Sequence, residues 1–214
     1  FDGKDLINYY YDNFRLPVYD SIDAPKIVPT LAHDVLDADH SNSDNPWDLK
    51  TSAYESARYE LELEALHFIK WGKLVEIGSC EGHFTNMMVR EFSDREIIAT
   101  EPNKRFYKQL NSNLGDKIRT ENIDVREVVE SCDVLFVSSL LYYVVPFPLN
   151  ILNNLSKYIV LSHQKLYHEQ IIDPIMTAKG YEIIYERDLC GRIEPMWNVF
   201  DIKEGTNIKI WKKK

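Results

Sequence analysis

Residues 73–85 read KLVEIGSCEGHFT, which is the pattern of a strand, a glycine turn and the start of a helix. Apolar residues over 73–77 predict a short strand, and residues 84–92 predict an amphipathic helix. Gly78 permits an abrupt turn and the close approach of a ligand, while Gly82 lets the helix pack near the strand. A tight turn with a purely structural role is the alternative. Because the turn lacks the P-loop pattern and the third glycine of the dinucleotide fingerprint, we expect a ligand without a pyrophosphate.

Strands and helices continue to alternate towards the end of the chain. Further strand patterns lie at residues 96–100, 118–122, 133–138, 158–162, 181–186 and 207–211. Strands that alternate with helices predict a mostly parallel sheet covered by helices. Only the turn-rich residues 188–205 separate the last two strand patterns, so we expect an antiparallel hairpin there. The sequence therefore predicts a doubly wound α/β fold with a mostly parallel, seven-stranded sheet.

The first 50 residues differ from the rest of the chain. They hold ten aspartates and four of the nine prolines, and proline both removes a backbone donor and restricts the residue before it. We therefore expect an irregular acidic arm or lid over residues 1–50, whose aromatic residues 9–11 dock on the main domain at 51–214. A helix is predicted to begin at Thr51 or Ser52 and to end near Trp71.

The composition excludes several classes of partner. Lysine and arginine number 25 against 34 aspartates and glutamates, a net charge of −9, which disfavours nucleic acid and acidic membranes. The three cysteines form no CxxC pair, so we predict no metal site and a reducing, cytoplasmic location. The same metal-free prediction follows from His33, His40, His67 and His168, which lack a Cys or carboxylate at ligand spacing. No apolar run approaches the roughly 20 residues of a membrane span.

Glu101 is the second informative residue. It directly follows the predicted strand at 96–100 and lies 25 positions after Glu76. An acid that ends the second strand of a doubly wound sheet can accept hydrogen bonds from ribose hydroxyls. A solvated carboxylate at a strand end is the alternative, but the glycine turn beside it favours a ligand that contains a nucleoside.

This combination resembles the class I, Rossmann-like S-adenosylmethionine-dependent methyltransferases over about residues 74–214. The resemblance implies S-adenosyl-L-methionine as the cofactor and S-adenosyl-L-homocysteine as its product. It implies that Glu101 binds the ribose, that Asp124 contacts the adenine, and that Leu140 belongs to the motif after the fourth strand. The cofactor-binding residues implied by these motifs are Glu76, Gly78, Cys80, Gly82, Glu101, Asp124 and Leu140.

A closer resemblance comes from residues 45–59, NPWDLKTSAYESARY. It is similar to the NodS-like branch, typified by the nodulation N-methyltransferase that modifies the deacetylated amine of a chitooligosaccharide. In that branch this segment helps to close the cofactor site, which implies roles for Trp47, Tyr54 and Arg58. Ser139 departs from the branch, which has a Glu before its Leu-Tyr-Tyr run. For Trp47 the alternative is an anchor for the arm, and for Arg58 it is an ion pair on an exposed helix face.

Two residues are candidates for catalysis. Tyr142 follows the fourth strand at the carboxyl edge of the sheet, where ligands bind in doubly wound folds. His163 follows the predicted strand at 158–162 and has an ordinary pKa near 6.5, which suits a general base. A hydrogen-bonded histidine with a structural role is the alternative.

The sequence thus predicts a methyltransferase that acts on a small molecule, namely a sugar or sugar-derived natural product, at nitrogen or oxygen. An inactive binding module that keeps the fold is the alternative. A nucleotide-linked oxidoreductase is disfavoured because the third glycine is missing. The oligomeric state stays open.

Overall fold

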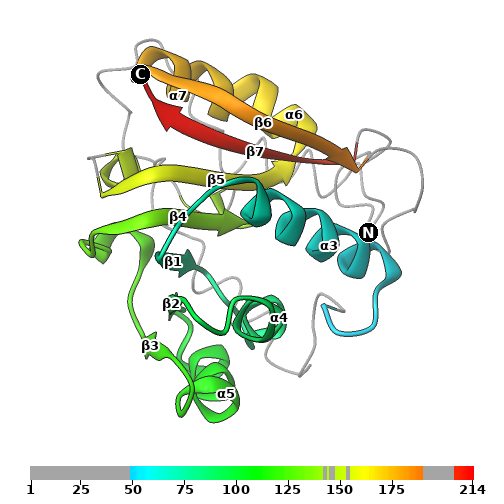
Figure 1. The fold of residues 1–214 in the computed structure, drawn as a ribbon, viewed down its shortest axis with the longest axis vertical. Coiled ribbons are helices and arrows are strands. Elements are labelled where there is room, and N and C mark those ends of the chain that lie inside the picture. The colour runs from blue at the N-terminus through cyan, green and yellow to red at the C-terminus, as the bar shows by residue number, and fades with distance from the viewer. Residues whose placement is uncertain (1–48, 142–143, 145–147, 153–154, 190–204) are drawn as a thin grey trace, which may run out of the picture.

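The structure is a computed structural model that describes residues 49–141, 144, 148–152, 155–189 and 205–214. Its seven strands form one sheet in the order β3-β2-β1-β4-β5-β7-β6 (Figure 1). The strands are β1 Lys73–Ile77, β2 Glu96–Thr100, β3 Arg119–Glu121, β4 Cys132–Ser138, β5 Ser156–Gln164, β6 Tyr181–Leu189 and β7 Thr206–Lys213. The α-helices are α3 Ala53–Phe68, α4 His83–Glu91, α5 Lys104–Leu114, α6 Lys165–Tyr167 and α7 Asp173–Ala178. Shorter helical turns are η1 Val125–Glu127, η3 Leu149–Leu152 and the π-helix η4 His168–Ile172.

The strand directions confirm the predicted fold class. Strands β1 to β5 pair in parallel, whereas β7 runs antiparallel to both of its neighbours, β5 and β6. The predicted C-terminal hairpin is present as β6 and β7. Most of the predicted arm, residues 1–48, lies outside the described residues, and so does Trp47.

Several predicted boundaries were wrong. Strand β6 continues to Leu189 and not to 186, and β7 spans Thr206–Lys213 and not 207–211. Helix α3 ends at Phe68 and not near Trp71, because Ile69 is extended and the Trp71 ring turns into the core, where its Nε1 donates to the Leu66 carbonyl at 3.1 Å. Strand β5 continues past 162 to Gln164, because its pairing with β7 extends to Gln164 opposite Thr206. His163 therefore lies within the strand rather than after it.

The sheet buries an apolar cluster on each of its faces. Successive residues of a strand point to opposite faces. Leu74 joins a cluster that contains Leu66 of α3 and Met88 of α4, while Val75 joins one that contains Met176 of α7. Helices α3 and α4 thus cover one face, and the segment around α7 covers the other.

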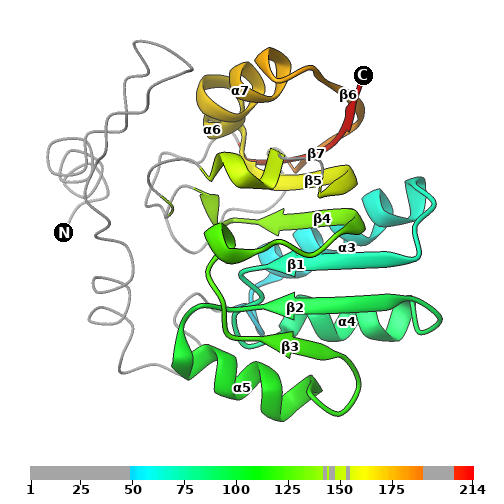
Figure 2. The same ribbon diagram turned by 90° about the vertical axis from the view of Figure 1, so that its left-hand side faces the viewer.

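Parallel pairing brings the carboxyl ends of the strands to one edge of the sheet. Figure 2 shows the arrowheads of β1 to β4 on the same side. Because β7 is antiparallel to β5, its first residue, Thr206, lies at this edge too. The glycine turn after β1, Glu101 after β2 and the turn after β4 therefore lie close together.

Within the described ranges, no helix has both the length and the apolar character needed to cross a membrane.

Gly82 allows a test of the packing of the glycine turn. Gly82 and Gly180 have φ angles of 84° and 82°, which disfavour any side chain. A Cβ on Gly82 would also lie 2.7 Å from Cδ1 of Leu110 and 3.1 Å from Cδ1 of Leu114, whereas one on Gly180 would meet nothing within 4 Å. Gly180→Ala should lower the free energy of unfolding by about 1–2 kcal/mol through the left-handed backbone alone. Gly82→Ala should lose about 1–3 kcal/mol more through overpacking.

Urea unfolding followed by circular dichroism measures both losses. Equal losses in the two variants would show that helix α5 yields without cost and that Gly82 is needed only for its backbone conformation.

Candidate functional site

The turn after β1 is fixed by hydrogen bonds to the end of β2. The Gly78 and Ser79 amides both donate to the Thr100 carbonyl at 2.9 Å. Glu101 accepts the Cys80 amide on Oε2 and the Asn103 amide on Oε1, each at 2.9 Å, and its side chain is 6% exposed. A carboxylate oxygen can accept more than one hydrogen bond, so this geometry is compatible with ribose hydroxyls as further donors.

The turns after β1 and β4 both contain strained backbone. Among the described residues, the non-glycine residues with positive φ are Cys80 at 50° and Ser139 at 49°. Such conformations are uncommon outside glycine and gather at functional sites. The two turns also touch, since a Cβ on Gly78 would lie 2.9 Å from Cδ2 of Leu140. The structure thus brings together Gly78, Cys80 and Leu140, three of the predicted cofactor residues.

Glu76 is a buried carboxylate beneath the glycine turn. Its Oε2 accepts hydrogen bonds from the Ser79 hydroxyl at 2.9 Å and the Thr85 hydroxyl at 2.6 Å. Burial raises the pKa of Glu76 to about 7, although the two hydroxyl donors favour the ionised form. The charge of this side chain is therefore sensitive to its surroundings near neutral pH.

Glu81 is a buried carboxylate that the sequence analysis did not single out. Its side chain is 4% exposed, and neither oxygen accepts a hydrogen bond within the described part of the chain. Its position inside the glycine turn is the sequence feature that could have indicated a role in the site. Burial raises the pKa of the neighbouring Cys80 thiol well above its usual range, and the charges of Glu81 and Glu101 act in the same direction. Cys80 therefore stays a thiol, which is a poor nucleophile.

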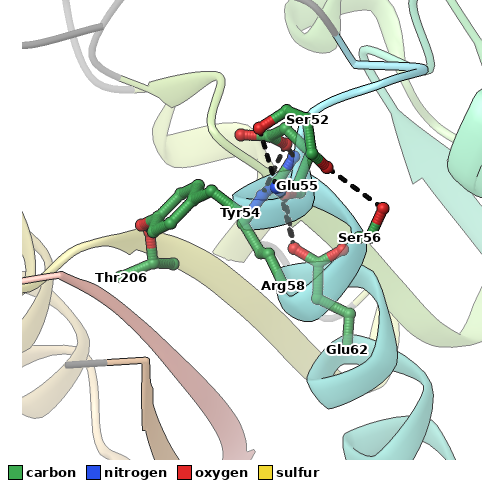
Figure 3. A network of polar contacts seen from close by, with 8 residues as sticks. Ser52, Tyr54, Glu55, Ser56, Arg58, Glu62 and Thr206 are labelled. Carbon is green, nitrogen blue, oxygen red and sulfur yellow. Dashed lines mark hydrogen bonds and ion pairs between the residues drawn. The ribbon is translucent and has the colours of Figure 1, made fainter. Parts of the chain in front are cut away.

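Arg58 connects helix α3 to Ser138 at the end of β4, and Figure 3 shows it beside Glu55 and Glu62 of the same helix. Its Nη1 donates to Glu62 Oε1 at 2.8 Å and to the Ser138 hydroxyl, and its Nε donates to Glu55 Oε2 at 2.9 Å. The Ser138 hydroxyl donates in turn to Glu62 Oε1 at 2.7 Å. The ion pairs considered for Arg58 are present, but the guanidinium is buried and not on an exposed helix face.

Tyr54 connects the start of the same helix to β7. Ser52 caps α3 by accepting the Glu55 amide at 3.3 Å, which sets the direction of its first turn. From that turn the Tyr54 ring reaches the first residue of β7, where its hydroxyl bonds to the Thr206 hydroxyl (Figure 3). Tyr54 and Arg58 therefore fasten α3 along the carboxyl edge of the sheet.

Asp124 lies beyond β3 and is bound within its own loop. Its side chain caps η1 by accepting the Arg126 amide at 2.9 Å, and it pairs with the Arg126 guanidinium at 2.6 and 2.9 Å. Asn122 performs a connecting role that the sequence analysis missed: its amide donates to the carbonyls of Glu101 at 2.7 Å and Pro102 at 2.9 Å. Its place at the end of β3 was the available signal.

His163 is fully buried, with 0% exposure. Its Nε2 accepts the backbone amides of Leu141 at 3.1 Å and Leu140 at 3.4 Å. These contacts are those of a residue that supports the turn after β4. Tyr142, the other predicted catalytic residue, lies outside the described residues. Across the described ranges, no group of three or more His, Cys, Asp or Glu residues could hold a metal ion.

Comparisons with solved structures support the fold. The N-methyltransferase NodS from Bradyrhizobium japonicum WM9, solved with S-adenosyl-L-homocysteine, matches with a TM-score of 0.67 and 15% identity over 85% of this chain and 98% of that chain. The magnesium protoporphyrin IX methyltransferase from Synechocystis PCC 6803, solved with bound SAM, matches with a TM-score of 0.55 and 11% identity over 100% of this chain and 98% of that one. No curated protein sequence matches the chain.

A comparison with family models gives the family. The model for nodulation protein S (NodS) matches residues 28–160. The match begins inside the predicted arm, upstream of the motif at 45–59 on which the resemblance rests. It includes the glycine turn after β1 and the turns after β2 and β4. Because it spans well over half of the 214 residues, the chain belongs to the nodulation protein S (NodS) family of class I methyltransferases.

Proposed function

We propose that this methyltransferase transfers the methyl group of S-adenosyl-L-methionine to a nitrogen or oxygen of a sugar or sugar-derived small molecule. The observation that supports this cofactor is the set of three buried carboxylates around the glycine turn. Glu76, Glu81 and Glu101 are each at most 6% exposed. A cofactor with a sulfonium and an ammonium group gains from this negative field, whereas a pyrophosphate is repelled by it.

The residues of the turn divide the proposed binding task. Glu101 binds the ribose hydroxyls, Gly78 lets the ligand approach the backbone closely, and Gly82 keeps the turn in shape by letting it pack against α5. Leu140 packs on the cofactor from the turn after β4, and Asp124 contacts the adenine. Support for this assignment comes from the contact between Leu140 and Gly78, and from the amide bonds that hold Glu101 in place.

The N-terminal segment and α3 complete the proposed site. Trp47, Tyr54 and Arg58 close over the cofactor, with residues 1–50 as the lid. The buried position of Arg58 beside Ser138 supports its role, because it fixes the guanidinium at the edge of the sheet where the cofactor binds. Tyr142, which follows the fourth strand in the sequence, is the proposed contact for the acceptor.

Methyl transfer is an in-line displacement, so the protein mainly has to hold the acceptor atom about 3–3.5 Å from the methyl carbon. The bound cofactor would supply the methyl group: its carbon–sulfur bond would break as the bond from the acceptor nitrogen or oxygen to the methyl carbon forms, and the proton of the acceptor would pass to water. A sugar acceptor is supported by the family to which the chain belongs. The small molecule is also favoured over a nucleic acid by the net charge of −9.

Calorimetric titration with S-adenosyl-L-homocysteine tests the cofactor site. Glu101→Ala should bind roughly ten to a hundred times more weakly than the parent, because a hydrogen-bonded charged group contributes about 1.5–3 kcal/mol. Glu96→Ala is the matched control, since Glu96 lies at the other end of the same strand and its side chain is 58% exposed. Equal affinity in the parent and a folded Glu101→Ala protein would contradict the assignment. A parent that binds the cofactor but methylates no sugar in an acceptor screen would contradict the acceptor class.

The raised pKa of Glu76 predicts a pH-dependent cost in stability. Its pKa rises from 4.5 to about 7 on folding, so between these values the folded state holds a proton that the unfolded state has lost. Stability therefore falls as the pH rises through this window. Glu76→Gln should gain up to roughly 3 kcal/mol relative to the parent between pH 5 and pH 8.

Urea unfolding at both pH values measures this gain, and Glu96→Gln should show none. If the charge of Glu76 serves the cofactor, the stabilised variant should also bind S-adenosyl-L-homocysteine more weakly at pH 8. A stability difference that is independent of pH would show that Glu76 is ionised throughout.

A further inference from the structure

Three successive backbone amides of the turn after β4 donate hydrogen bonds to β5. The Ser139 amide donates to the Ser162 carbonyl at 2.8 Å, which continues the parallel ladder of the two strands. The next two amides, of Leu140 and Leu141, leave the ladder and both donate to Nε2 of His163. The chain can make this change of direction because Ser139 adopts a left-handed backbone, with φ at 49°.

The two amides define the chemical form of the imidazole. A nitrogen that accepts two N–H donors must offer its lone pair, so the ring is neutral and carries its proton on Nδ1. A protonated ring would turn an N–H group towards two other N–H groups. Burial lowers the pKa of His163 well below its usual range, and the charges of His168 and Arg58 act in the same direction.

The ring is held in place by a second layer of polar residues. His168 crosses it edge to face with ring centroids 5.9 Å apart, and the tilted ring of Tyr167 lies with its centroid 5.8 Å away. His168 is itself fixed, because its Nε2 bonds to the Asn207 carbonyl at 3.0 Å and its Nδ1 lies 3.5 Å from Asp173. His163 therefore packs against Tyr167 of α6 and against His168 of η4, which Asp173 of α7 and Asn207 of β7 hold in place.

The turn carries one residue that faces the glycine turn, Leu140, and one that is buried in the core, Leu141. Leu140 occupies the space that a side chain on Gly78 would fill, and Leu141 is 0% exposed. Ser138, just before the turn, bonds to Arg58 and Glu62. A change in the direction of this turn would thus move Leu140 away from the cofactor side of the sheet edge.

We propose that His163 is a positioning residue: as an acceptor of the Leu140 and Leu141 amides, it holds the turn after β4 in the conformation that binds the cofactor. Only one part of its test, the affinity for the cofactor, rests on the proposed function. His163 then acts through the backbone and takes no proton from the acceptor.

Two amide side chains give a matched test. In Gln, the terminal oxygen reaches about as far from the backbone as Nε2 of His, whereas in Asn it reaches only about as far as Nδ1. His163→Gln can therefore accept the two amides, and His163→Asn cannot, although both are neutral, polar and unable to act as a base. Calorimetry with S-adenosyl-L-homocysteine and amide hydrogen exchange at Leu140 and Leu141 are measured on the parent and both variants.

The expected result is rescue by Gln alone. His163→Asn should bind roughly tenfold or more weakly with faster exchange at the two amides, because it leaves buried donors unsatisfied. His163→Gln should stay close to the parent in both readouts and should retain methyl transfer, which a variant without its general base would lose. Parent-like behaviour of both variants, or equal losses of affinity with the two amides still protected, would overturn the proposal.

A third measurement is independent of the variants and of the cofactor. Nitrogen chemical shifts of the parent should show His163 protonated on Nδ1 alone from pH 6 to pH 8, and protonation on Nε2 would overturn the proposal. If the parent fails to bind S-adenosyl-L-homocysteine, the proposed function fails, while the exchange rates and nitrogen shifts still decide the role of His163.

Discussion

The carboxylate of Glu101 joins two turns that belong to different strands, and the geometry of the site depends on it. By accepting the Cys80 amide it holds the glycine turn after β1, and by accepting the Asn103 amide it orients the start of α5. Asn122 adds the end of β3 to the same junction through the Glu101 carbonyl. Hydrogen bonds of the protein itself therefore hold three strand ends together, as a preorganised binding site requires.

The same region concentrates groups that oppose folding. Glu76 and Glu81 are carboxylates buried away from water. Cys80 and Ser139 adopt a left-handed backbone conformation that is uncommon outside glycine. Helix α3 adds to this cost, because the charge of Glu62 also raises the pKa of Glu76, while Arg58 pairs with Glu55 and Glu62. Such an arrangement is typical of a site where stability is given up for binding.

The sequence predicted the framework well because the framework follows from local patterns. The predicted bounds of β1 and β2 agree with the structure, because each strand is a short apolar run that is followed by a glycine or a charged residue, Gly78 and Glu101. The extra length of β5 could not be predicted, because its polar ends, including His163, are strand residues only through their partners on β7. The meeting of Gly78 with Leu140 also depends on long-range packing. For Arg58, helical spacing indicated the pairs with Glu55 and Glu62 but not their burial, which comes from Ser138 on a distant strand. Trp47 and Tyr142 lie outside the described residues, so their roles still rest on the sequence and the family.

The position of β7 has a consequence for how the chain is made. In the sheet, β6 pairs only with β7, and β7 alone connects it to β5. A ribosome that has completed β6 has thus produced two strands that cannot yet join, and β5 presents an open edge of backbone donors and acceptors. The sheet closes only when residues 206–213 emerge and pair with β5 on one side and with residues 181–189 on the other. During synthesis the nascent chain therefore passes through a stage in which another strand, from this protein or a different one, can occupy the place of β7.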